Sequence, residues 1–148
     1  MTEDDSLFTI TQTHLDSGMR GIPVGTCKTS FVDPIEGVHY VGYPVEDLAD
    51  LEEEDVVYLL MHKRLPTEEE SEAFRAELAY RAMEMPTGAL RVLESLTPGS
   101  GHPMDWLSMG IMALGAADTT GDVRTDSMNL IARMPELMAR IFLLRGGN

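Results

Sequence analysis

The stretch from residue 29 to residue 51 most constrains how this chain can fold. Two short segments rich in strand-forming residues, 29–33 and 38–40, flank the tetrapeptide Pro34-Ile35-Glu36-Gly37. Proline presets one backbone angle and glycine can take a positive φ, so this tetrapeptide favours a tight turn and a small β-hairpin. After Pro44 the apolar residues recur at helical spacing, which indicates that most of the remaining chain is helical.

The periodic segments predict about five or six helices. Leu48 to Leu60 carry one apolar stripe, and the acidic residues 52–55 suit a helix N-terminus. Thr67 and Glu70 fit a capping box, which starts a second helix that extends to about residue 83. Further helices are expected at 89–96, 103–116 and 126–145, and Pro135 should kink the last one. The alternation over residues 7–13 favours a short strand or an extended part of an N-terminal arm, residues 1–17.

Composition limits the partners and the compartment. The formal charge of −14 argues against nucleic acid and anionic membrane surfaces, because both bind basic proteins. Cys27 is the single cysteine, so an internal disulfide is excluded and a reducing compartment is favoured. The first residues lack a secretory or transit pattern, and no apolar run reaches the roughly 20 residues of a bilayer span. A soluble cytoplasmic protein is expected.

The predicted helix over 103–116 is apolar on nearly all sides. Its apolar residues surround the axis rather than form one stripe, and they are Met104, Trp106, Leu107, Met109, Ile111, Met112 and Leu114. Such a helix must be covered on nearly all sides. We therefore expect the chain to form a homo- or hetero-oligomer through this helix.

Catalytic and metal-binding motifs are not evident in the sequence. His14, His39, His62 and His102 have no histidine or cysteine partner at metal-ligand spacing, and no serine lies in a Gly-x-Ser-x-Gly elbow. His102 precedes Pro103 and is interpreted as a helix-entry residue. We predict neither catalytic residues nor a metal site within this chain.

Several motifs occur in the order in which the citrate synthase family places them. They are Gly18-Met19-Arg20-Gly21 before the hairpin, Leu59-Leu60 with Leu65-Pro66-Thr67, His102-Pro103-Met104, Ala113-Leu114-Gly115-Ala116, and Leu130-Ile131-Ala132-Arg133-Met134-Pro135. The chain resembles the N-terminal part of citrate and 2-methylcitrate synthases over residues 18–148. The resemblance implies a partial large domain that is mainly α-helical, with a small N-terminal hairpin.

The resemblance also implies an activity and a ligand contact. Family members condense acetyl-CoA or propionyl-CoA with oxaloacetate, and they use two histidines and an aspartate outside the part that this chain resembles. In members with Gly-Met-Arg-Gly the arginine approaches the phosphates of coenzyme A, so Arg20 is the predicted cofactor-binding residue. Its alternative role is a turn residue that pairs with a local carboxylate. Val41 departs from the family, which usually has an arginine between Tyr40 and Gly42.

Three interpretations remain open at this point. The chain is an N-terminal subunit or fragment of a citrate synthase-type acyltransferase, inactive without a C-terminal citrate synthase-like chain. Alternatively it is a non-catalytic interaction or regulatory module that has kept the association helices. The third interpretation, an enzyme in its own right, has the least support because no base and oxyanion donor are recognisable in the sequence.

Overall fold

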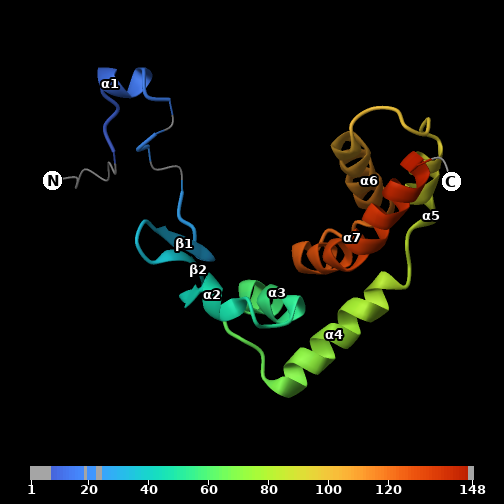
Figure 1. The fold of residues 1–148 in the computed structure, drawn as a ribbon, viewed down its shortest axis with the longest axis horizontal. Helices are drawn as coiled ribbons and strands as arrows, with labels where there is room; N and C mark the ends of the chain where they lie inside the picture. Colours follow the sequence, from blue (N-terminus) through green and yellow to red (C-terminus); the bar gives the residue numbers. More distant parts are fainter. Residues whose placement is uncertain (1–7, 19, 23–24, 147–148) are drawn as a thin grey trace. The chain divides into compact units, whose positions relative to one another are not determined.

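The computed structural model describes residues 8–18, 20–22 and 25–146 (Figure 1). These residues form two compact units, one ending at Leu51 and the other beginning at Glu52. The part of the chain that the structure describes contains seven helices and three short strands. The predicted mainly α-helical fold with a small antiparallel sheet is therefore confirmed.

The first unit contains the sheet. Strand β1 (Ser30–Asp33) pairs antiparallel with β2 (Gly37–Tyr40), with Ser30 opposite Tyr40, so the predicted hairpin is confirmed. Asp33 stabilises the hairpin turn because its Oδ1 accepts from the amides of Ile35 and Glu36 at 2.7 and 2.8 Å. A third strand, β3 (Tyr43–Pro44), extends the sheet in the order β1-β2-β3 and was not predicted.

Two short helices complete the first unit. Helix α1 (Gln12–Leu15) lies where the alternating pattern favoured a strand or an extended segment. It forms because Thr11 and His14 make a capping box in which the Thr11 amide donates to Nδ1 of His14 at 2.9 Å. Helix α2 (Val45–Leu48) follows β3 directly and contacts β2 and β3. The expected strand is thus wrong at residues 12 and 13, and residue 7 lies outside the described residues.

The second unit is a set of five longer helices. They are α3 (Glu53–His62), α4 (Glu68–Ala82), α5 (Thr87–Glu94), α6 (Pro103–Asp118) and α7 (Val123–Gly146). The capping box of α4 is confirmed, because the Glu70 amide donates to Thr67 Oγ1 at 3.3 Å and the Thr67 amide donates to Glu70 Oε2 at 2.9 Å. Helix α7 continues through Pro135.

One predicted helix is divided in two. The sequence pattern indicated a single helix from Leu48 to Leu60, but α2 ends at Leu48 and α3 begins at Glu53. Glu52 has φ −65° and ψ 143°, an extended backbone that interrupts helical hydrogen bonding. The spacing of apolar residues did not reveal this break, but the acidic residues 52–55 are suited to the helix N-terminus that lies there.

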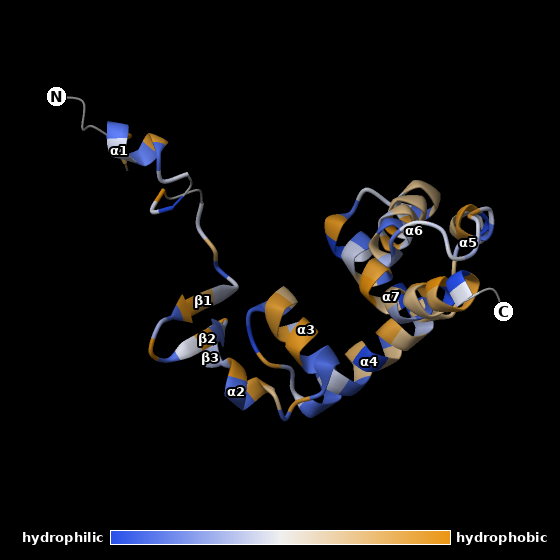
Figure 2. Ribbon diagram, turned by 45° about the horizontal axis from the view of Figure 1, so that its top comes forward, coloured by the Kyte–Doolittle hydropathy of each residue, from blue (hydrophilic) through white to orange (hydrophobic). Residues whose placement is uncertain are grey.

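Helix α7 joins the two apolar clusters of the second unit. Near its start, Met128 packs with Tyr58 of α3 and with Phe74 and Leu78 of α4. Farther along, Leu137 and Ile141 belong to a cluster with Ala89, Leu93, Trp106 and Leu114 from α5 and α6. Figure 2 shows the hydrophobic colouring that extends along most of α6 and the hydrophilic beginning of α4. Among the described helices, none has the length and apolarity of a bilayer span.

Candidate functional site

The predicted coenzyme A residue lies on a turn in the first unit. Gly18 and Gly21 have φ of 62° and 77°, the left-handed region that glycine adopts without strain, and Arg20 between them is exposed. Met19, in the same motif, lies outside the described residues. Among the described carboxylates, none forms an ion pair with Arg20. Arg20 remains a predicted ligand residue.

Val41 occupies a strained position in the turn between β2 and β3. Val41 and Gly42 have φ of 52° and 88°, and Tyr40 pairs with Tyr43, which is the geometry of a two-residue type I′ turn. A β-branched residue is an outlier at positive φ. The valine side chain therefore adds backbone strain to this turn.

A pocket of about 480 Å³ lies beside this turn. Cys27, Ser30, His39 and Val41 are among the residues that line it. Hydrogen bonds from the Ser30 hydroxyl (3.2 Å) and the Thr29 hydroxyl (3.5 Å) lower the pKa of the Cys27 thiol to about 6. The thiol is exposed, and the lowered pKa favours its thiolate, the nucleophilic form of cysteine. The sequence identified Cys27 as the single cysteine, but only the structure shows that the Thr29 and Ser30 hydroxyls contact its sulfur.

Two of the four histidines cap helices. His102 caps α6 as predicted for a helix-entry residue, because its Nδ1 accepts from the Met104 amide at 3.2 Å and its own amide donates to Asp105 Oδ2 at 3.0 Å. His14 caps α1. His39 lies on β2. Within the described residues no histidine forms an ion pair with a carboxylate, so no His–carboxylate acid–base pair is assembled there.

His62 lies in an aromatic cluster where α3, α4 and α7 meet. Its ring stacks on Tyr58 with centroids 3.9 Å apart and an interplanar angle of 7°, and Phe74 lies edge-on to both rings. Arg124 Nη2 of α7 donates to His62 Nε2 at 2.6 Å. Burial, together with the positive charges of Arg124 and Arg64, holds the pKa of His62 below its usual value.

Arg64 is held in place by the start of α4. Its guanidinium donates two hydrogen bonds to the Glu70 carboxylate, at 2.7 and 2.5 Å, and a third to the Tyr58 hydroxyl at 3.0 Å. Because the charged form of Glu70 accepts these bonds and the Thr67 amide, the pKa of Glu70 lies far below its usual value.

A buried arginine of α7 lies beside the last residue of α6. Arg133 of α7 is 8% exposed and donates through Nη1 to the Asp118 carboxylate, while its Nε is buried without a hydrogen-bond partner among the described residues. Asn129 bridges Asp118 to Arg81 of α4, which donates to Asn129 Oδ1 at 2.6 Å. Arg133 also lines a mainly apolar pocket of about 320 Å³ between α6 and α7. The motif at residues 130–135 contained this arginine, but its burial depends on helix packing.

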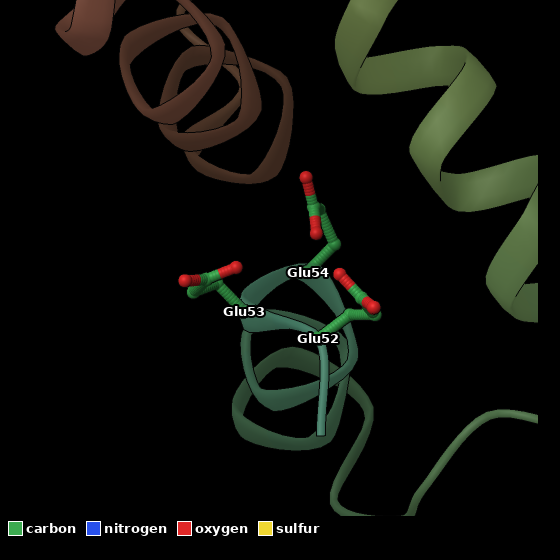
Figure 3. A group of neighbouring side chains, drawn as sticks. All are labelled: Glu52, Glu53 and Glu54. Atoms are coloured by element: carbon green, nitrogen blue, oxygen red, sulfur yellow. The ribbon is translucent and has the colours of Figure 1, made fainter. Parts of the chain in front are cut away.

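Three consecutive carboxylates surround the beginning of α3. Oxygens of Glu52, Glu53 and Glu54 lie within 4.8 Å of one another, a spacing that a cation could bridge (Figure 3). Glu52 and Glu53 are exposed, and acidic side chains are favourable at a helix N-terminus without any ion. The position of these three glutamates at a helix N-terminus therefore explains their clustering.

The fold and the histidine contacts described above define a class of protein, and the sequence comparisons then define its family. The chain is a mainly helical protein with a small antiparallel sheet, and its described histidines form no His–carboxylate pair. Its sequence from residue 18 to residue 148 matches the family model described as "Citrate synthase, C-terminal domain".

Individual citrate synthases are also similar to this chain in sequence and in structure. The citrate synthase of Haloferax volcanii is 36% identical over 145 residues, which cover 90% of this chain and 38% of the relative. The Synechocystis enzyme is 32% identical and covers 88% of this chain and 34% of its own length. The crystal structure of Thermotoga maritima citrate synthase aligns with a TM-score of 0.75 and 27% identity, covering 90% of this chain and 36% of that structure.

The chain belongs to the citrate synthase family. The family model covers most of its length, and the Pyrobaculum aerophilum citrate synthase shares its fold with a TM-score of 0.73 at 25% identity. The chain spans only between a third and two fifths of the length of the relatives reported above.

Proposed function

We propose that this chain is one part of a citrate synthase-type acyltransferase of the tricarboxylic acid cycle, and that catalysis requires a second stretch of polypeptide. The observation that carries the proposal is family membership over residues 18–148 combined with coverage of 38% of the Haloferax volcanii relative. The chain supplies scaffold, an association surface and one coenzyme A contact. The substrates are an acyl-CoA, either acetyl-CoA or propionyl-CoA, and oxaloacetate.

The chemistry explains why a second stretch is needed. Condensation begins when a carboxylate base removes a proton from the carbon beside the thioester, while a hydrogen-bond donor stabilises the developing oxyanion. The resulting enol carbon then bonds to the ketone carbon of oxaloacetate, whose oxygen takes up a proton, and water cleaves the thioester to release coenzyme A. The described histidines cap helices, lie on β2 or stack on Tyr58, and none of them pairs with a carboxylate. These arrangements support the proposal that base and donor come from elsewhere.

A thiol-release assay tests whether catalysis requires a second stretch of polypeptide. The purified chain, with acyl-CoA and oxaloacetate, should release coenzyme A only at the background rate. Adding the remaining part of a full-length relative, such as the Haloferax volcanii enzyme, should raise the rate above background. Turnover by the chain alone would contradict the proposal. A change in the kinetics of an intact citrate synthase, without any complementation, would favour the alternative of a regulatory module.

Arg20 is proposed to contact the coenzyme A phosphates in the complete assembly. Its guanidinium is exposed on a glycine-bounded turn, and paired donors suit phosphate oxygens. Loss of one such charge-assisted contact should weaken coenzyme A binding by roughly 1.5–3 kcal/mol, or about ten- to hundred-fold. Calorimetry on the reconstituted complex should show this loss for Arg20→Ala and partial recovery for Arg20→Lys. Parent-like binding by Arg20→Ala would assign Arg20 to the turn alone.

The association surface is proposed to include the outward face of α6. Its inner face is covered by its own chain, since Trp106, Gly110 and Leu114 are buried. Its outer face leaves Met104 and Met112 57% and 74% exposed. We expect a homodimer or a complex with the second stretch of polypeptide. Light scattering should show association at micromolar concentration that Met112→Asp disrupts, and a monomeric parent protein would contradict the interface.

The proposed compartment is the cytoplasm. Cys27 is exposed as a free thiol, a state that reducing compartments maintain. Fractionation of the native host should find the chain with soluble cytoplasmic enzymes.

A further inference from the structure

We propose that the hydrogen bond between His62 and Arg124 is a proton-sensitive contact that ties the first turn of α7 to the end of α3, and that acidification releases it. Its two partners lie 62 positions apart in the sequence, so the contact exists only because α3 and α7 both pack against α4. The His62–Arg124 hydrogen bond is one of the polar contacts that join the beginning of α7 to the other helices of the second unit.

The geometry fixes the protonation state that the contact requires. A guanidinium has only donors, so Arg124 Nη2 at 2.6 Å can bond only to an Nε2 that carries no proton. The neutral imidazole, with its proton on Nδ1, satisfies this requirement. Protonation adds a hydrogen to Nε2 of His62, so two donors then face each other across 2.6 Å and two positive charges come together. The bond is then replaced by repulsion.

The surroundings of His62 contain no carboxylate free to stabilise the imidazolium. The charged groups that act on it are Arg124 from α7, Arg64 from the segment after α3, and Glu70 from α4. The Glu70 carboxylate is already occupied by Arg64 and by the Thr67 amide. The stacked Tyr58 ring, 5% exposed, supplies no polar group to the imidazole face. Burial and the two arginines together favour the neutral ring.

Loss of the contact would loosen the first turn of α7 without unfolding the helix. Asp126 accepts hydrogen bonds from Thr119, Thr120 and Gly121, and these contacts do not involve His62. Val123 and Asp126 in this turn also line the pocket between α6 and α7.

The sign of the pH dependence follows from the direction of the shift. The pKa of His62 in the folded chain lies below the unfolded value of about 6.5. As the pH falls below about 6.5 the unfolded chain takes up the proton first, so the folded state loses stability until the pH passes the folded pKa. Above about pH 6.5 the contribution of this contact is constant.

Nuclear magnetic resonance of the whole chain provides the test. The His62 ring signal, assigned by its disappearance in His62→Gln, should titrate below pH 6.5 in the parent chain. Arg124→Gln should move the midpoint upward, and Arg124→Lys, which keeps the charge, should move it less. Arg124 is exposed, so both substitutions are expected to leave the fold intact.

Amide exchange gives a second measurement that does not depend on the ring assignment. Protection factors at residues 124–127 should fall on acidification of the parent chain and stay level in His62→Gln, whose side-chain oxygen accepts from Arg124 at every pH. A His62 midpoint at or above 6.5 would overturn the proposal. So would equal pH dependence of protection in the parent and in His62→Gln.

Discussion

Replacing Gly110 with alanine tests how closely α6 and α7 pack. A methyl group at Gly110 would lie 2.9 Å from Cδ1 of Leu137, 3.3 Å from Cδ2 and 3.5 Å from Cγ. Carbon atoms attract one another best at about 3.5–4.0 Å, so the leucine must change rotamer or the helices must separate. Leu137 is fully buried at 0% exposure, which leaves little room for either change.

Two opposing contributions set the size of the effect. Alanine is favoured over glycine inside a helix by about 1 kcal/mol. Overpacking a core costs about 1–3 kcal/mol. We therefore expect Gly110→Ala to lower the free energy of unfolding by about 0–2 kcal/mol.

Gly115→Ala in the same helix is the matched control. A methyl group at Gly115 would meet no atom within 4 Å, so only the helix preference acts and stability should rise by about 1 kcal/mol. The two variants should therefore differ by about 1–3 kcal/mol. Urea unfolding followed by fluorescence of Trp106 measures this, because the single tryptophan is buried in the same cluster as Leu137.

The Leu137→Ala variant shows whether the contact between residue 110 and Leu137 causes this difference. In Leu137→Ala the obstructing side chain is gone, so Gly110→Ala should then stabilise the chain much as Gly115→Ala does in the parent. If Gly110→Ala and Gly115→Ala stabilise the parent chain equally, the close approach of α6 and α7 is refuted.

Three further changes test the other features of the chain. Val41→Asn should raise the free energy of unfolding by about 1 kcal/mol, because asparagine tolerates the positive φ that strains valine; thermal unfolding that shows no gain would contradict the strain. Asp118→Ala should cost about 3 kcal/mol in urea unfolding because Arg133 stays buried without its partner, and Arg133→Met should cost less; an equal or greater cost for Arg133→Met would contradict this account. Alkylation of Cys27 should rise with an inflection near pH 6 and shift to higher pH in Ser30→Ala, whose lost hydrogen bond is the largest cause of the low pKa; an unchanged inflection would exclude that cause.

The sequence alone determined the elements whose signals are local. The capping box at Thr67 and Glu70, the proline after His102 and the turn at residues 34–37 each act within a few residues, and each was found where predicted. The order of the family motifs also pointed to the citrate synthase family. The spacing of apolar residues missed the break at Glu52, where the backbone is extended, although the acidic residues 52–55 are suited to the helix N-terminus that follows it.

The tertiary structure decided which of these residues meet. His62 and Arg124, Asp118 and Arg133, and Gly110 and Leu137 are paired by the crossing of helices rather than by spacing in the chain. Helical periodicity shows which face of a helix is apolar, but it does not show which other helix covers that face. The burial of Arg133, the low pKa of His62 and the partial covering of α6 therefore follow from packing, because desolvation and charge proximity exist only once distant segments are in contact.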